Sequence, residues 1–315
     1  MTRATIKNAR RKAAPTKPEP RLSRGLLLAA VTGVAGLIAT GVLLWNGLQG
    51  EKVFSGVPFN DPGPIHVHGL GINPGDGSLF IATHTGLFRV ATDSRQAFRV
   101  ADRYQDTMGF SIVGPNRFLG SGHPDLREKS LPPRLGLIES TDAGKTWKSI
   151  SLLGDADFHV LRSIGSRVYG YDSSNDRLLA SADEGRTWRE LTRPAPIVDL
   201  TPDPSDPRRL AATAIGNLDQ GLYMSSDGGE SWKRGNDAVG LLAWPTAKRL
   251  YLVDGQGNVL ASSDGGRTVT RRGDIGGEPA ALLAVAKSEL YAALHDGTIK
   301  HSIDGGNTWT VRSSP

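Results

Sequence analysis

The chain has 315 residues, 38% of them hydrophobic, so it can bury a substantial core and is neither disordered nor fibrous. Its net charge of +5 does not indicate nucleic-acid binding, because residues 1–24 carry eight Lys and Arg against one acid and the rest of the chain is therefore slightly acidic. The absence of Cys excludes disulfides, thiolate metal sites and lipid attachment through a Cys.

An uncharged segment follows the basic tail. Leu26 to Trp45 is a run of 20 residues without a charge, which is the length a helix needs to cross about 30 Å of hydrocarbon. The cations before it predict a cytoplasmic N-terminus and a chain that continues outside the cytoplasmic membrane. A cleaved signal peptide is the alternative, but its apolar core is usually only about 7–15 residues long. We predict a basic cytoplasmic tail over 1–24, a transmembrane signal-anchor over 25–48, a linker over 49–62 and a folded domain over 63–315.

One octet recurs through the folded domain with the pattern S-x-D-x-G-x-x-W. It begins at residues 140, 181, 225, 262 and 302, and a degenerate copy spans 91–98. Asp and Gly favour turns and the aromatic residue can pack on a sheet, so we expect each octet to connect the third and fourth strands of a repeated unit. The residues expected to have this structural role are Asp142, Trp147, Asp183, Trp188, Asp227, Trp232, Asp264, Asp304 and Trp309.

Two apolar runs precede each octet and predict two further strands per unit. The first run spans residues 65–72, 108–114, 158–164, 196–202, 239–245 and 281–286, and the second spans 78–84, 117–123, 167–172, 209–215, 249–254 and 289–295. Six units of four short strands predict an all-β fold, a six-bladed β-propeller. We expect the ring to close through a strand borrowed from residues 54–59. A propeller needs no partner to cover its sheet edges, so a monomer is expected.

The histidines are unevenly placed on this pattern. Six of the seven lie where the first strand of a unit begins or the second ends, which is one face of a propeller, around its central channel. His66 and His68 are two residues apart on a predicted strand, so both side chains should project to the same side. We predict that a ligand binds at the channel mouth to His66, His68, His84, His123, His159 and His295.

A metal ion is one candidate for this ligand. Imidazole with a thioether suits copper, and imidazole with carboxylate suits zinc or iron. The predicted ligands of a copper or zinc ion are His66, His68, His123, His159 and Met108. Carboxylates flank the same rim at Asp106, Asp125, Asp157 and Asp172. Asp106 and Asp172 are also candidate catalytic carboxylates, since glycosidases use such pairs.

From about residue 57 to residue 309 the chain resembles the bacterial Asp-box (BNR) repeat proteins, a sialidase-like group of predicted glycosyl hydrolases. The octets carry the resemblance, together with the stretches HVHGL, ATHTGLF, SGHPD and DFH, which contain His68, His84, His123 and His159. A sialidase of this fold would need an arginine triad and a FRIP-like stretch in the first blade. The chain has no FRIP-like stretch and offers only Arg134 and Arg162 as scattered arginines, so true sialidase activity is not expected.

Three classes of function remain open. The first is a membrane-anchored extracytoplasmic propeller that binds a metal ion or small ligand, the second is a sialidase-like glycoside hydrolase, and the third is an assembly scaffold for a membrane complex. The photosystem assembly factors with Asp-box propellers are a resemblance of the third kind. Whether the protein is an enzyme is left open by the sequence.

Overall fold

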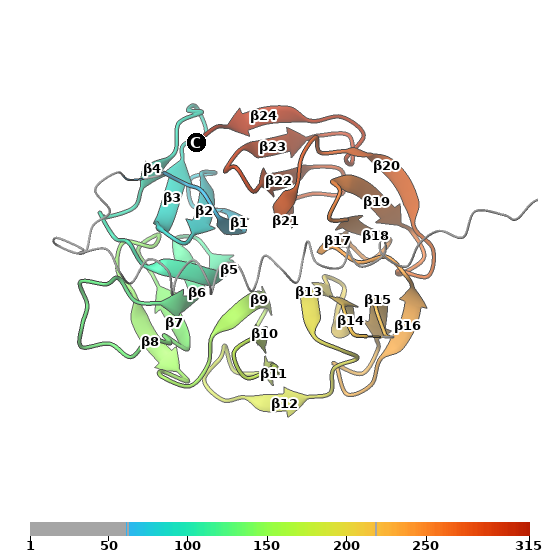
Figure 1. Ribbon diagram of the computed structural model, residues 1–315, viewed down its shortest axis with the longest axis horizontal. Helices are drawn as coiled ribbons and strands as arrows, with labels where there is room; N and C mark the ends of the chain where they lie inside the picture. The colour runs from blue at the N-terminus through green and yellow to red at the C-terminus, as the bar shows by residue number, and fades with distance from the viewer. Residues whose placement is uncertain (1–60, 62, 218) are drawn as a thin grey trace, which may run out of the picture. The chain divides into compact units, whose positions relative to one another are not determined.

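The computed structural model describes residues 61, 63–217 and 219–315, and within these ranges the chain forms strands and no helix that could cross a membrane. The predicted tail, the signal-anchor and almost all of the linker lie outside the described residues. The strands form six four-stranded antiparallel sheets, each built from one continuous stretch of chain. Figure 1 shows the six sheets arranged as the blades of a propeller.

The blades follow one another along the chain, and their strands have the following bounds. Blade 1 contains β1 (Val67–Ile72), β2 (Leu79–Thr83), β3 (Gly86–Val90) and β4 (Phe98–Arg99). Blade 2 contains β5 (Asp106–Gly114), β6 (Arg117–His123), β7 (Leu137–Ser140) and β8 (Lys148–Ser151). Blade 3 contains β9 (Phe158–Ile164), β10 (Arg167–Asp172), β11 (Arg177–Ser181) and β12 (Arg189–Leu191). Blade 4 contains β13 (Ile197–Asp203), β14 (Asp206–Ala214), β15 (Gly221–Ser225) and β16 (Lys233–Asn236). Blade 5 contains β17 (Leu241–Thr246), β18 (Arg249–Val253), β19 (Asn258–Ser262) and β20 (Thr270–Asp274). Blade 6 contains β21 (Pro279–Ala284), β22 (Leu290–Leu294), β23 (Ile299–Ser302) and β24 (Thr310–Ser313).

The predicted six-bladed propeller is confirmed, and all twelve predicted first and second strands are present with their ends within three residues of those expected. The first strand of each blade lies innermost and the fourth outermost (Figure 1). In the buried strands the side chains on both faces of the sheet are mostly apolar, because both faces of a blade pack against neighbouring blades. Six apolar clusters result, and each joins two adjacent blades, including blade 6 with blade 1.

Within the described residues the ring closes between blade 6 and blade 1, and residues 54–59, from which a strand was expected to be borrowed, lie outside these ranges. Blade 6 already has four strands of its own, and it contacts blade 1 through an apolar cluster that includes Val67 and Tyr291. Polar contacts reinforce this junction, since Arg312 on β24 donates hydrogen bonds to the carbonyl oxygens of Ser94 and Ala91, the latter at 2.8 Å. Ser313 Oγ donates to a third carbonyl oxygen of the same turn at 2.7 Å. Each described blade therefore takes its four strands from one continuous stretch of the chain.

The octets form the turns between third and fourth strands, at the positions that the sequence predicts. In the blade 4 copy, Ser225 Oγ donates to Asp227 Oδ1 at 2.7 Å and accepts from the backbone N–H of Gly229 at 2.9 Å. Asp227 also accepts from the hydroxyl and the N–H of Ser231, at 2.5 and 3.0 Å. The hydroxyl of Ser231 is the main cause that holds the pKa of Asp227 below its usual range, followed by the hydroxyl of Ser225. The octet aspartates therefore shape turns.

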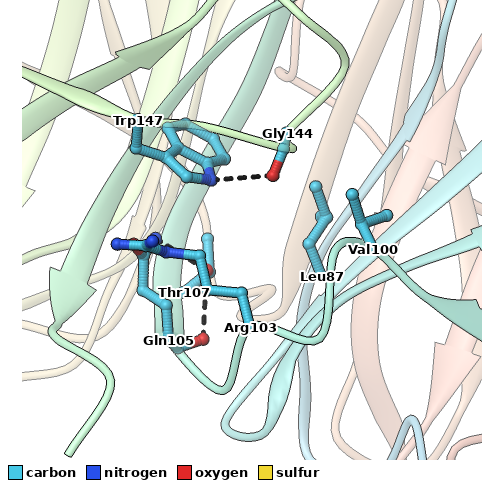
Figure 2. Close-up of a pocket in the computed structure, with 7 residues that line it drawn as sticks. All are labelled: Leu87, Val100, Arg103, Gln105, Thr107, Gly144 and Trp147. Carbon is cyan, nitrogen blue, oxygen red and sulfur yellow. Dashed lines mark hydrogen bonds between the residues drawn. The ribbon is translucent and has the colours of Figure 1, made fainter. Parts of the chain in front are cut away.

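The octet also joins each blade to the preceding one. Figure 2 shows Trp147 and Gly144 of the blade 2 octet opposite Leu87 and Val100 of blade 1, with the Trp147 Nε1 hydrogen bond to the Gly144 carbonyl oxygen, 3.1 Å long. Gly144 has a φ of +84°, and a Cβ atom on it would lie 2.3 Å from Leu87 Cδ2. Glycine is required here for two reasons, backbone conformation and close approach.

Candidate metal centre on the histidine face

We call the face of the ring at which first strands begin and second strands end the histidine face. In five blades the pairing of the first and second strands skips one residue near this face, so the first strand carries a β-bulge there. The bulged residues are His68, Met108, His159, Val198 and Ala280 in blades 1, 2, 3, 4 and 6. A bulge re-aims a side chain, and in blades 1–3 the re-aimed side chain is of a type that binds metals.

Three side chains from two blades converge next to the bulge of blade 1. His84, in the turn after β2, places Nδ1 3.0 Å from Oδ2 of Asp106, the first residue of β5. The ring of His68 meets the ring of His84 edge to face, with 4.3 Å between centroids. One ligand atom of each of His68, His84 and Asp106 lies within 4.8 Å of the other two. This group, the blade 1–2 triad, has the size of a metal coordination sphere.

Two atoms of the blade 1–2 triad are shielded from solvent and have no hydrogen-bond partner in the described residues: Nε2 of His68 and Oδ1 of Asp106. A buried polar atom without a partner costs about 1–3 kcal/mol. Such atoms are commonly explained by an ion or a functional role. The arrangement therefore leaves one imidazole nitrogen and one carboxylate oxygen without a partner among the described residues.

The protonation of the triad suits a cation as well. Burial lowers the pKa of His68 well below its usual range, and the charges of His84 and other histidines of this face lower it further. Burial alone would lower the pKa of His84, but the hydrogen bond to Asp106 and the charge of Asp106 raise it. At neutral pH His68 is therefore uncharged, the form in which imidazole binds metals.

His66 lies beside the triad but is not held there as the sequence suggested. It precedes β1, has a φ of +53°, and is exposed, with its ring centroid 5.5 Å from that of His84. The alternation of side chains along a strand does not place His66 and His68 on the same side, because His66 is outside the strand and His68 is the bulged residue. Both histidines nevertheless contact His84. Burial and the charge of His84 lower the pKa of His66. Left-handed backbone at a residue other than glycine is often found at functional sites.

A second group of side chains surrounds Asp157, just before β9. Oδ2 of Asp157 lies 3.1 Å from Nε2 of His159 and 3.7 Å from Nε2 of His123, and it accepts from Ser174 Oγ at 3.3 Å. Oδ1 is shielded from solvent and has no partner in the described residues. Burial would raise the pKa of Asp157, but the hydrogen bond and charge of His159, and then the charge of His123, lower it. We call His123, Asp157 and His159 the blade 2–3 cluster.

The remaining predicted ligands have different surroundings. His295 lies near Glu278, with Nε2 and Oε1 4.0 Å apart, and its charge influences His66 and His68. Met108 is buried. The six predicted histidines therefore divide into two groups, with four of them around the blade 1–2 triad.

Asp172, the second member of the predicted catalytic pair, is enclosed in the structure. Its side chain is fully buried, Oδ1 accepts from the backbone N–H of Asp157 at 3.2 Å, and Oδ2 accepts from Asn175 at 2.8 Å and from Arg177 at 2.7 Å. A carboxylate with both oxygens occupied inside a blade cannot contact a substrate. It positions the loop that carries Asp157 instead, so Asp106 is the one member of the proposed pair at the rim.

Other charged side chains singled out in the sequence also bond to groups of the protein itself. Asp125 accepts from the backbone N–H groups of Tyr104 and Arg127 and from the Arg127 guanidinium, and although burial opposes it, these bonds lower its pKa to about 2. Arg162 is bound to the buried Asp199 at 2.7 Å, and Arg134 donates to the carbonyl oxygen of Asp155. Neither arginine belongs to a carboxylate clamp.

The sequence interpretation did not include Asp106 and Asp157 among the metal ligands, nor His84. A signal was available, because a His that ends or follows a second strand is paired in space with an Asp that opens or precedes the next blade's first strand. His84 with Asp106 and His123 with Asp157 both follow this rule. The bulges could not be read from the sequence, because they are a property of strand pairing.

Comparison with known proteins agrees with the fold. Residues 136–263 match the Sortilin-Vps10 family, described as "Sortilin, neurotensin receptor 3". The chain is similar to the solved structure of a GH74 enzyme of Niastella koreensis, with a TM-score of 0.56 and 15% identity over 79% of this chain and 45% of that one. The shared feature is the β-propeller. At this identity the likeness concerns the fold alone.

Two curated proteins match parts of the chain. The dispase autolysis-inducing protein of Streptomyces mobaraensis is 31% identical over 115 residues, which cover 36% of this chain and 29% of that protein. A xyloglucanase of Paenibacillus sp is 27% identical over 202 residues, 49% of this chain and 19% of the enzyme. The matches therefore span less than a third of the length of these relatives.

Proposed function

We propose that this protein is a membrane-anchored, extracytoplasmic β-propeller that binds a divalent transition-metal ion on its histidine face through His68, His84 and Asp106. The observation that carries the proposal is the convergence of three ligand atoms within 4.8 Å, with buried lone pairs of His68 and Asp106 that have no partner among the described residues. The anchor is supported by the uncharged run from Leu26 to Trp45 and the basic residues before it.

Two imidazoles and one carboxylate suit zinc, copper(II) or iron(II) better than the hard ions magnesium and calcium. The triad comes from β1, the turn after β2 and the start of β5, so two rigid blades hold it. His66 is exposed beside it, so its imidazole or a water molecule could take a further position on the ion.

The test is elemental analysis of the purified full-length chain after exposure to zinc, copper(II) or iron(II) and removal of free metal. We expect bound metal in the wild type, and at least one equivalent less in His84→Ala and in Asp106→Asn. His301→Gln is the matched control, because His301 lies away from the histidine face. It contacts Glu289 and stacks on Tyr291. Wild-type protein without metal, or metal content unchanged in both triad variants, would refute the proposal.

A glycoside hydrolase is the second candidate, favoured by the similarity to the xyloglucanase of Paenibacillus sp. With Asp172 enclosed, Asp106 is the remaining carboxylate of the proposed catalytic pair at the rim. The hydrolase predicts that xyloglucan is cleaved in the presence of a metal chelator and that Asp106→Asn abolishes cleavage. Absence of new reducing ends with xyloglucan and with aryl glycosides would eliminate this candidate.

A further inference from the structure

A groove lies where blade 6 meets blade 1, between the segment that precedes β1, the end of β4 and the residues that follow β24. In the part of the chain that the structure describes, its volume is about 350 Å³. Its apolar lining consists of Pro64, Phe88, Ala97, Phe98 and Pro315. We call this space the closure groove. An apolar cavity of about 150 Å³ holds one benzene ring, so the closure groove has room for about two aromatic side chains.

The degenerate octet of blade 1 explains why this groove is open. In four other blades the octet Trp packs against the apolar cluster shared with the preceding blade. Between blades 1 and 2, Trp147 lines the corresponding space, which has no room for a water molecule (Figure 2). Blade 1 instead has Phe98 at the Trp position, where it is 60% exposed, and Ala97 packs against the cluster shared with blade 6. The junction of blades 6 and 1 therefore lacks the side chain that fills the space between blades 1 and 2.

The chain enters the propeller at the closure groove. Asp61 lines the groove and forms an ion pair with Arg99 of β4. Two residues later, the carbonyl oxygen of Gly63 accepts a hydrogen bond from Thr85 Oγ1 at 3.0 Å. Nη1 of Arg99 is shielded from solvent and has no acceptor among the described residues, which is unusual for a buried donor. These contacts fix the point at which the preceding residues reach the propeller, and that point is beside an exposed aromatic ring.

The residues directly before this point are mostly apolar. Residues 53–59 read VFSGVPF and carry no charge. An extended chain spans at most about 3.3–3.6 Å per residue, so the Cα atom of Phe59 is no more than about 7 Å from that of Asp61, and that of Phe54 no more than about 25 Å. The Gly and Pro between the two phenylalanines favour a turn, which would bring both rings to one place. The segment therefore has the composition and the reach to fill the closure groove.

From these observations we propose that residues 54–59 bind in the closure groove, with the rings of Phe54 and Phe59 against its apolar lining. The segment is joined covalently to one side of the groove, which gives it an effective concentration of about millimolar, and a separate ligand has no such advantage. The bound segment clasps blades 6 and 1 at the junction where the octet Trp is missing. It also leaves residues 49–53 as the free part of the linker between the predicted signal-anchor and the folded domain.

The absence of Cys allows a crosslinking test in the full-length chain. We expect the Phe54→Cys/Phe98→Cys variant to form a disulfide within one chain under mild oxidation, because this bond forms when the two Cα atoms are about 4.4–6.8 Å apart. Phe54→Cys/Ile303→Cys is the matched control and should stay reduced. Ile303 is an exposed apolar residue of the blade 6 octet and does not line the groove. Phe98 and Ile303 are both exposed, so neither substitution removes a core side chain.

The other outcomes of the crosslinking test would overturn the proposal. A disulfide between two chains through position 98 would show that a second copy occupies the groove. Equal disulfide formation in the two variants would show that the segment is not bound at one place. Absence of the disulfide from both variants would leave the groove to a separate ligand.

Chymotrypsin provides a measurement that needs no cysteine. In the full-length chain, cleavage after Phe54 should be about tenfold faster in Phe98→Asp than in the wild type, because a charge in the apolar lining releases the segment and cleavage follows the population of the open form. Leu126→Asp is the matched control, since it places the same charge at an exposed residue of another loop, and cleavage should keep the wild-type rate. An unchanged rate in Phe98→Asp would contradict the proposal.

Discussion

The substitution His68→Leu should separate stability from metal binding. In the metal-free protein Nε2 of His68 is shielded and has no partner in the described residues, which costs about 1–3 kcal/mol. Leucine has a similar size and no polar atom, so the free energy of unfolding of the metal-free variant should rise by about 1–3 kcal/mol. For a domain of this size that corresponds to roughly 2–4 °C in Tm per kcal/mol.

Metal should reverse the order of stability. A ligand at a thousandfold excess over its Kd adds about 4.1 kcal/mol to the free energy of unfolding of the protein that binds it, more than the variant gains in chelator. The wild type gains this from the triad and the variant does not, while binding elsewhere contributes to both. We therefore expect the variant to melt at a higher temperature in chelator and the wild type to melt at a higher temperature in excess zinc.

The assay is thermal unfolding followed by circular dichroism, with and without zinc. His295→Leu is the matched control, because His295 lies on the same face, is partly exposed, and has no shielded atom without a partner. It should show no gain in chelator. A His68→Leu protein that is less stable than the wild type in chelator would refute the reasoning, because the lone pair of Nε2 would then have a stabilising partner.

Three further predictions concern the scaffold. Gly144→Ala should lower the free energy of unfolding by roughly 2–4 kcal/mol in denaturant titrations, because its backbone would be strained and its Cβ atom would lie 2.3 Å from a neighbouring side chain. Gly165→Ala, with a φ of +57° and no atom within 4 Å of the added Cβ, should cost only about 1 kcal/mol, and equal losses in the two variants would contradict the packing argument. Arg312→Ala should speed hydrogen exchange in β24 and the turn after β3, because two hydrogen bonds that close the ring are lost, and an unchanged exchange pattern would count against that role. The pKa of Asp227 is lowered in the folded state, so its contribution to stability is complete above about pH 5 and is lost as the pH falls toward 2. Asp227→Asn should therefore flatten the acid side of a plot of Tm against pH. Asp237→Asn, which changes an exposed carboxylate outside the octets, should leave that part of the plot unchanged.

Much of the fold could be predicted from the sequence because a propeller repeats one local pattern. Each octet forms its turn with bonds among its own residues, as Ser225, Asp227 and Ser231 do, so the pattern is visible in a single repeat. The strands before it show continuous apolar runs because both faces of each blade are buried. The contacts of Arg312 that join blade 6 to blade 1 were not predicted, since they connect segments more than 200 residues apart.

The gathering of histidines on one face also followed from the sequence, because the ends of repeated strands occupy equivalent places in the ring. The division into a triad and a cluster did not follow. It depends on bulges at His68 and Met108, and on contacts such as His84 to Asp106 that cross from one blade to the next. The enclosure of Asp172 by Arg177 was equally hidden, since a carboxylate at a strand end can face solvent or a neighbouring loop.

The sequence alone thus determined the number of blades, the place of the octets and the face that carries the histidines, because these depend on local periodicity and turn chemistry. The tertiary structure decided which histidine meets which carboxylate, which lone pairs lack partners and which carboxylate is enclosed. Those properties depend on how closely neighbouring blades approach one another, at glycines such as Gly69 and Gly109, and on strand register, which no single stretch of sequence specifies.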